Sequence, residues 1–519
     1  MKRTDKLFIL TLLLVIPLKI GFSRQIAIAH QQQETTREIE SIPTEVETKI
    51  DPRRTNSDNP ETNTTVDPEP VDPYETLVKA DFLYQQGDRE AAEELYRKVK
   101  APFESHQNTM FPDPINNAEN LSTEIQTQWE EAKKAADKND NLEMLQEFVA
   151  QHSEFVPGHL LLAKTLQKNK KEKEALQVLE KAASILPDSA EIVEAHVKAL
   201  RKEKDYLKAS IAARQFVLVN PESPEAEKFQ EIADENFDKF QNNIKGQMLG
   251  KGIFGTAIRV GSCALLGNCD CNVVGIAVGE AIKMGSLMLQ GESGLGSRAA
   301  ESYKKKLSLV EDEEVVEYVT KMGNSIAELT GRDDFEYEFY VVRDNSLNAF
   351  VFPGGKVFVN TGAILNTNSE AELAGLIAHE VAHAVLSHGF QRIVTNNLYD
   401  SAGDIISDVL KTDIPIGNIV SNLISLQYSR SNERQADIIG TRVLATAGYA
   451  ADGLRNFMAT VDEKYGSKGS LSFLSTHPAS DDRVEYLEQL IEHNGYNRYA
   501  FEGVEKHREI QEKLKSKME

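Results

Sequence analysis

The sequence predicts a multidomain protein in which an all-α region precedes an α+β domain. Three observations predict this class. The chain has 519 residues, of which 40% are apolar, so it is long enough for three or four domains with real cores. Residues 73–240 show helical periodicity with a repeat of about 34 positions. Farther along, short runs rich in Val, Tyr and Phe stand beside an Ala- and Leu-rich helical segment.

The charge balance excludes one class of function. Acidic residues number 81 and basic residues 58, which gives a formal net charge of -23. Such a balance argues against a broad nucleic-acid surface, because phosphate binding needs clustered Lys and Arg. The chain has three cysteines within nine positions, Cys263, Cys269 and Cys271. They are too few and too local for a disulfide framework.

The N-terminus has the pattern of a secretory signal, which we place at residues 1–29. Three basic residues precede a 12-residue apolar run, Leu7–Leu18, and small residues follow up to Ala29. The run is shorter than the roughly 20 residues of a membrane-spanning helix. We therefore expect an extracytoplasmic protein, with the periplasm as its compartment; the alternative is a membrane anchor that is not cleaved. Residues 30–72 are polar and acidic, and we expect a disordered tether.

Residues 73–240 contain units that align with one another at positions occupied by small residues and by proline. Ala175 and Pro187 of one unit align with Ala209 and Pro221 of the next, and an earlier unit begins at Pro73. These units resemble tetratricopeptide repeats, whose stacked helix pairs form a protein-binding surface. The alternative is an ordinary helical bundle. Residues 241–296 are rich in Gly and apolar residues, and we interpret them as a helical connector for which membrane contact is an open alternative.

The segment after Ser369 predicts a metal-binding helix. Ser369 and Glu372 form the pattern of a capping box, and an Ala- and Leu-rich run follows. This helix carries His379 and His383 four positions apart on one face, a spacing that suits two imidazoles on one Zn²⁺. Glu380 lies next to the first histidine. There its carboxylate can act as a general base on a metal-activated water without being a ligand.

A second helical segment supplies the remaining groups. Glu433, Asp437 and Gly440 share one face at positions i, i+4 and i+7. Glu433 would complete a His-His-Glu site, and Asp437 would hold a ligand imidazole through its other ring nitrogen. Gly440 would let the two helices approach closely. His388 lies half a turn away from His379 on a continuous helix, so we expect it at the surface or beside a ligand, and not as a ligand itself.

An ordered set of motifs between residues 297 and 492 resembles the HExxH peptidase family that includes the heat-shock protease HtpX, the CAAX prenyl endopeptidase and the periplasmic β-barrel assembly-enhancing protease. The matching motifs are Asn348-Ala349-Phe350, Pro353-Gly354-Gly355, Thr361-Gly362, His379–His383, Glu433–Gly440, Thr476-His477-Pro478 and Arg483. The resemblance implies a zincin-type α+β metalloprotease domain over residues 297–495, followed by a charged C-terminal helix at 496–519. It also implies one zinc ion per chain, held by His379, His383 and Glu433, with Glu380 as the base.

Four other residues receive roles from this resemblance. Strands at Phe339–Arg343 and Lys356–Asn360 flank a loop in which Asn348 and Ala349 are candidates for aligning an extended peptide substrate. His477 is interpreted as an oxyanion stabiliser, as a self-inhibiting zinc ligand or as a structural histidine. Arg483 is expected to hold that loop or to stabilise developing charge.

The function predicted from these features is a secreted zinc endopeptidase of envelope protein quality control. Its substrates would be proteins or peptides, and the helical repeats would recruit clients or dock onto an envelope assembly complex. Two alternatives remain: a chaperone or assembly factor with a latent protease fold, and a membrane-embedded protease.

Overall fold

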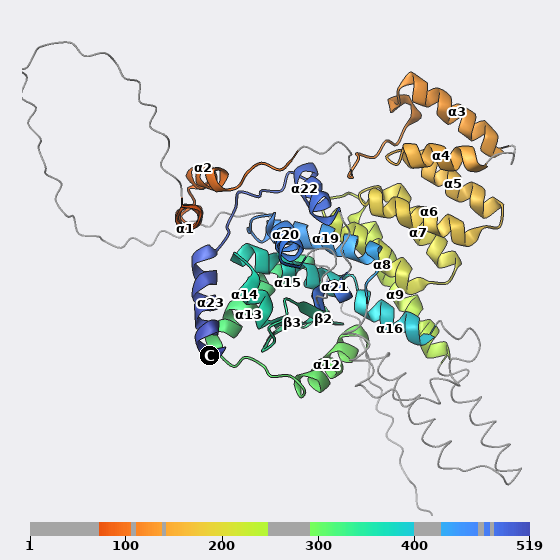
Figure 1. The fold of residues 1–519 in the computed structure, drawn as a ribbon. Coiled ribbons are helices and arrows are strands. Elements are labelled where there is room, and N and C mark those ends of the chain that lie inside the picture. Colours follow the sequence, from red (N-terminus) through yellow and green to blue (C-terminus); the bar gives the residue numbers. More distant parts are fainter. Residues whose placement is uncertain are drawn as a thin grey trace, which may run out of the picture. The chain divides into compact units, whose positions relative to one another are not determined.

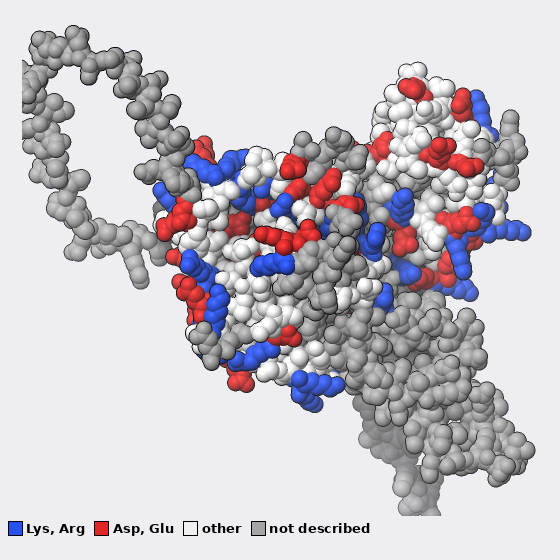
Figure 2. Space-filling view, viewed as in Figure 1, with Lys and Arg blue, Asp and Glu red and all other residues white. Residues whose placement is uncertain are grey.

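The structure is a computed structural model that describes residues 72–104, 110–137, 142–247, 291–398, 427–465, 472–477 and 482–518. The predicted signal peptide, the tether and the three cysteines lie outside these residues. The described chain is mostly helical and contains one three-stranded sheet. Among the described residues, none of the helices combines the length and the apolar composition that a membrane span requires. Figure 2 shows acidic and basic side chains interspersed over the described part of the visible face.

The region with repeat periodicity forms consecutive helices. After α1 and α2 these are α3 (Thr123–Asp137), α4 (Leu142–Gln151), α5 (Val156–Lys168), α6 (Glu172–Ile185), α7 (Ala190–Lys202), α8 (Tyr206–Val219) and α9 (Ala226–Gln247). Each helix from α3 to α9 packs against the next one in the chain, as Figure 1 shows. The aligned residues Ala175 and Ala209 are fully buried, which lets neighbouring helices approach closely. The identity of these units as tetratricopeptide repeats stays a prediction.

The first helix pair, α1 (Pro73–Gln85) and α2 (Arg89–Val99), packs against the C-terminal part of the chain. The Asp81 carboxylate accepts hydrogen bonds from the backbone nitrogens of Glu502 (2.9 Å) and Val504 (3.1 Å). It also accepts one from the Tyr96 hydroxyl at 2.6 Å. The hydroxyl of Tyr84 donates to the carbonyl of Gly448 at 3.2 Å. Residues far apart in sequence are thereby joined, which the repeat pattern did not predict.

Lys100, just after α2, is expected to be the residue that most stabilises this junction. Its ammonium donates to Asp452 Oδ1 at 2.6 Å and to Glu502 Oε1 at 2.5 Å, and its side chain is 8% exposed. Substitution of Lys100 by Met would remove the cation between two buried carboxylates, of which Asp452 retains an ion pair with Arg498 at 3.2 Å, at a cost of about 3 kcal/mol in the free energy of unfolding. Urea unfolding measures this loss. The exposed Lys98→Met variant is the control, and equal midpoints for the two variants would contradict the prediction.

The C-terminal part combines helices with the sheet. Its helices are α12 (Gly291–Lys304), α13 (Glu313–Ala327), α14 (Thr361–Asn366), α15 (Glu370–Val385), α16 (His388–Leu398), α19 (Arg430–Thr446), α20 (Gly453–Tyr465), α21 (Ser472–Thr476), α22 (Arg483–His493) and α23 (Val504–Met518). The α15 helix lies at the centre, where it contacts α13, α19, α20 and the sheet. Every residue of α15 from Ala371 onward is buried.

The sheet has the order β1-β3-β2. Strands β1 (Glu338–Val342) and β3 (Lys356–Asn360) lie within one residue of their predicted ranges and pair in parallel. Strand β2 (Ala349–Phe352) was not predicted; it pairs with β3 in antiparallel register. The turn between them contains Gly354 and Gly355 with φ of 75° and 83°, values that favour glycine. The loop that was expected around Asn348 therefore leads directly into an edge strand.

The start of α15 differs in one detail from its predicted capping box. The hydroxyl of Ser369 accepts a hydrogen bond from the Glu372 nitrogen at 3.2 Å, as expected. The Glu372 carboxylate, however, accepts from the backbone nitrogen of Asn368 at 2.9 Å and not from that of Ser369. The second hydrogen bond of the predicted capping box, from the Ser369 nitrogen to the Glu372 carboxylate, is therefore wrong. The backbone and side-chain amides of Asn368 bind that carboxylate instead.

The predicted close approach of two helices at Gly440 is confirmed. A Cβ atom added there would lie 3.1 Å from the backbone nitrogen of His379. This contact brings α19 against the middle of α15, at the turn that carries the first histidine of the motif.

Candidate metal centre

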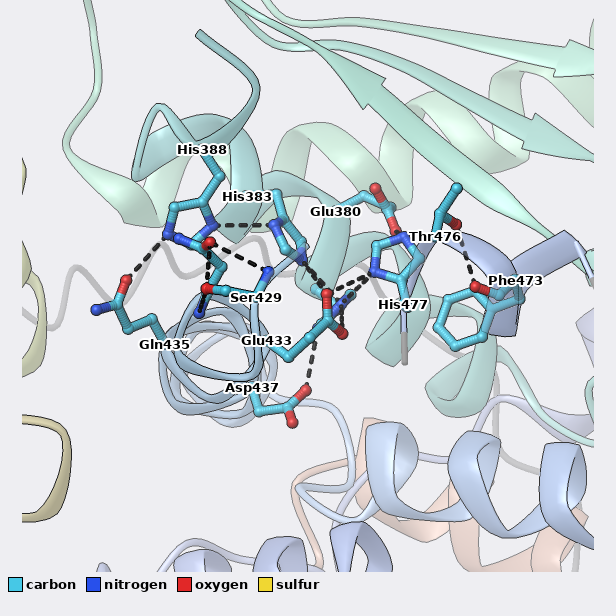
Figure 3. Close-up of polar contacts among 12 residues, drawn as sticks. Glu380, His383, His388, Ser429, Glu433, Gln435, Asp437, Phe473, Thr476 and His477 are labelled. Carbon is cyan, nitrogen blue, oxygen red and sulfur yellow. Dashed lines mark hydrogen bonds and ion pairs between the residues drawn. The ribbon is translucent and has the colours of Figure 1, made fainter. Parts of the chain in front are cut away.

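Four side chains from three parts of the fold meet in the interior of the C-terminal part. His379 and His383 extend from α15, Glu433 from α19, and His477 follows α21 directly. Figure 3 shows His383, Glu433 and His477 directed toward one another. Each is at most 4% exposed. One donor atom from each lies within 4.8 Å of the other three. Among the described residues this is the group of donors that could hold a metal ion.

The distances between the donor atoms fit a tetrahedral zinc ion. Two donors bound about 2.0–2.2 Å from one such ion are about 3.3–3.6 Å apart. His379 Nε2 lies 3.1 Å from His383 Nε2 and 3.5 Å from Glu433 Oε2. His383 Nε2 lies 3.5 Å from Glu433 Oε1. The donor set of two imidazoles and one carboxylate is therefore arranged as zinc requires.

His477 lies where a fourth donor would be. Its Nδ1 is 3.0 Å from Glu433 Oε1 and 3.3 Å from His379 Nε2. Its ring stacks on Phe473 with the centroids 4.6 Å apart. The structure thus brings His477 into contact with two of the sequence-predicted ligands.

Glu380 points into the same interior and is fully buried. Its Oε1 lies 3.3 Å from His477 Nε2, but neither carboxylate oxygen accepts a hydrogen bond from a described residue. Burial raises the pKa of Glu380 to about 7, and the nearby Glu433 adds to this rise. A carboxyl group with a pKa near neutrality can both accept and return a proton at physiological pH.

Asp437 and Arg483 contact the predicted ligands and fix their positions. Asp437 Oδ1 lies 3.0 Å from His379 Nδ1, the nitrogen that faces away from the donor cluster. Arg483 donates to Asp437 at 2.6 Å and lies 2.9 Å from Glu433 Oε2. Burial favours the neutral form of Glu433, but His477 and Arg483 outweigh it and lower the pKa of this carboxyl well below its usual range. Arg483 thus forms ion pairs with two carboxylates of the site.

His388 is buried beside His383, so of the two expected positions it adopts the one next to a ligand. Its Nδ1 lies 2.9 Å from His383 Nδ1, and its Nε2 lies 3.0 Å from Gln435 Oε1. Burial lowers the pKa of His388 to about 4. The expectation of a continuous helix was wrong, because α15 ends at Val385 and Ser387 adopts a φ of 56°.

Sequence reasoning missed two further residues around the donors. The ring of Tyr428 stacks on His383 with centroids 4.0 Å apart, and its backbone nitrogen donates to Thr476 next to His477. Gln435 contacts His388 and also lines a cavity of about 280 Å³ between α6–α8 and the first turns of α16 and α19. Neither belongs to a recognisable motif; only the position of Gln435 two residues after Glu433 could have drawn attention to it.

Asn348 and Ala349 lie at the beginning of β2 and are both buried. The Asn348 carbonyl accepts a hydrogen bond from the Asn360 nitrogen at 3.1 Å. Its side-chain Oδ1 has no donor among the described residues. Strand β2 is an edge strand of the sheet and contacts α15, so these residues connect the helix of the metal donors with the edge of the sheet.

The donor set is of the kind that metallopeptidases use to bind zinc. Comparison with known proteins supports this class: residues 313–491 match Peptidase family M48. The buried His-His-Glu group with its neighbouring histidine could hold the zinc ion on which such peptidases depend.

Several known peptidases are similar to part of the chain. It is 31% identical over 176 residues to the mitochondrial metalloendopeptidase OMA1 of Schizosaccharomyces pombe, covering 34% of this chain and 52% of that protein. It is 30% identical over 190 residues to a putative β-barrel assembly-enhancing protease of Vibrio cholerae, covering 34% and 39%. Human OMA1 is 31% identical over 178 residues, covering 32% and 34%. The chain thus spans about half or less of these relatives.

Proposed function

We propose that this protein is a zinc metalloendopeptidase that hydrolyses peptide bonds in protein substrates. The observation that supports it most is the fully buried Glu380, whose carboxylate adjoins a four-donor cluster and accepts no hydrogen bond from a described residue. A buried carboxylate in this position is costly unless it serves chemistry. The similarity to metalloendopeptidases agrees with this reading.

Each residue of the site has a definite task in this reaction. Zinc, when bound by His379, His383 and Glu433, supplies Lewis-acid activation of water and of the scissile carbonyl. Glu380 accepts the proton of the attacking water and returns it to the leaving amine. The positive charge of Arg483 balances the negative charges of Glu433 and Asp437. The outer edge of β2 would align the substrate as an added strand, with Asn348 and Ala349 at its start.

His477 is proposed to hold the site in a latent state. Its Nδ1 lies within 3.3 Å of two other donors, and its Nε2 faces the base Glu380. A substrate carbonyl and water need the space that this ring occupies, so His477 has to move before cleavage. This arrangement favours the self-inhibiting role over that of an oxyanion stabiliser.

The proposed setting is protein quality control in the cell envelope, with the helices α3–α9 recruiting clients or an assembly complex. The N-terminal signal pattern and the similarity to β-barrel assembly-enhancing proteases support this setting. N-terminal sequencing of protein from its native host distinguishes a cleaved signal from a retained membrane anchor.

Cleavage of a denatured protein by the full chain tests the activity. We expect turnover that a zinc chelator abolishes and that added zinc restores, and we expect His477→Ala to accelerate it. Slower cleavage by His477→Ala would instead assign this residue to oxyanion stabilisation. If neither form cleaves while both bind the denatured protein, the chaperone alternative holds.

A further inference from the structure

We propose, on the basis of the zinc site assigned above, that His388 and Gln435 are positioning residues that fix the tautomer of His383. They would keep the lone pair of His383 Nε2 directed at the metal. Neither residue belongs to the donor set. Figure 3 shows the three side chains in a row, with His388 between Gln435 and His383.

The contacts in this row determine where each proton lies. Gln435 Oε1 can only accept, and it lies 3.0 Å from His388 Nε2, so that nitrogen carries the proton. A neutral imidazole has one N–H, which leaves a lone pair on His388 Nδ1. This lone pair faces His383 Nδ1 at 2.9 Å, so His383 must donate from Nδ1. His383 Nε2 is then unprotonated, as a metal ligand must be.

The two histidine ligands therefore have orienting partners of different charge. His379 Nδ1 faces the carboxylate of Asp437 at 3.0 Å, which is the usual partner of a zinc-bound imidazole. His383 Nδ1 faces a neutral imidazole, which is held by a neutral amide. One charged and one uncharged partner orient both rings without burying a further negative charge beside Glu433.

A local break in the backbone brings His388 to this position. On a continuous helix His388 would lie five residues, or about 140° of rotation, beyond His383 and would face away from it. Instead α15 ends at Val385, and Ser387 adopts a φ of 56°. Buried contacts hold the break: Ser387 donates to Glu292 at 2.6 Å. Such a conformation is unfavourable for a non-glycine residue, so it persists only where neighbouring contacts impose it.

Two substitutions of His388 that differ by one methylene test the proposal. Asn places its carbonyl oxygen where Nδ1 stood and retains the acceptor for His383, whereas Gln extends past that position and loses it. We expect His388→Gln to weaken zinc binding about 10–100-fold and His388→Asn to stay within about threefold of wild type. Zinc affinity is measured by competition with a chromogenic chelator, and independently by the zinc-induced rise in Tm over that of the metal-free protein.

Gln435 offers a second pair of variants that does not alter the histidine. Gln435→Leu removes the acceptor for His388 Nε2 and should weaken zinc binding severalfold, and Gln435→Met, which also lacks an acceptor but is closer in shape to glutamine, should do the same. Long-range ¹H–¹⁵N spectra of histidine-labelled protein report the tautomer directly. Wild type should show His383 protonated at Nδ1, and Gln435→Leu should show a mixture of tautomers.

Three outcomes would overturn the proposal: wild-type zinc affinity in His388→Gln, equal weakening in His388→Asn and His388→Gln, or a His383 that is protonated at Nε2. His493→Asn, in a partly exposed histidine of α22, controls for general effects of histidine loss. If the His388 variants do not fold, the two Gln435 variants decide. A wild-type protein that binds zinc but cleaves no protein would contradict the proposed activity and leave this proposal intact.

Discussion

Replacement of Glu380 by Gln is expected to leave zinc bound and to lower kcat/KM for peptide cleavage about 10²–10⁴-fold, the usual contribution of a general base. The two side chains have nearly the same volume, so the fully buried site keeps its packing. Glutamine cannot accept a proton from water, however. Metal analysis of the purified variant and cleavage of a denatured protein measure the two effects separately.

A glutamate of the same helix provides the matched control. Glu370, at the first turn of α15, accepts a hydrogen bond from Tyr449 at 2.8 Å and lies outside the donor cluster. Glu370→Gln keeps an acceptor for Tyr449 and should leave cleavage unchanged. Full cleavage by Glu380→Gln, in a preparation free of other proteases, would exclude Glu380 as the base.

Replacement of Arg483 by Leu is expected to lower the free energy of unfolding by about 3–5 kcal/mol, because removal of one partner leaves buried charge uncompensated. Arg483 is 6% exposed and contacts both Glu433 and Asp437. Without it the two carboxylates repel each other, Glu433 tends to bind a proton, and zinc affinity falls as well. Chemical denaturation of the metal-free protein and chelator competition measure these losses.

The control for Arg483 is a second arginine that pairs with a glutamate. Arg201 contacts Glu235 at 3.2 Å, and the two side chains are 35% and 51% exposed. Arg201→Leu should therefore cost at most about 1 kcal/mol and leave zinc binding unchanged. If Arg483→Leu lowered kcat alone, with stability and zinc affinity as in wild type, Arg483 would act on the developing charge of the reaction and not through Glu433 and Asp437.

Much of the candidate site could be predicted because the residues that indicate it lie close together in the sequence. His379, Glu380 and His383 lie within five positions of one helix, and helical geometry alone places the two imidazoles on one face. The same reasoning applies to Glu433, Asp437 and Gly440 in α19. The order of the motifs then indicated the family, which the comparison with known proteins supports.

Other features depend on contacts between segments that are distant in sequence. The strand β2 was missed because four residues, Ala349–Phe352, give too short a pattern before they pair with β3. Docking of α1 and α2 requires Lys100 to meet Asp452 and Glu502, more than 350 positions away. The repeat pattern cannot predict such a pairing.

From sequence alone the chemistry of the candidate site could be predicted: a metal-binding helix, a general base and a second helix with a third ligand. How these groups are held follows from the packing of distant segments. That packing brings Arg483 against Glu433, places His477 where a fourth donor would be and directs His388 onto His383 at the break after α15. Helical spacing follows from backbone geometry, whereas buried charges and imidazoles find their partners only when separate elements pack together.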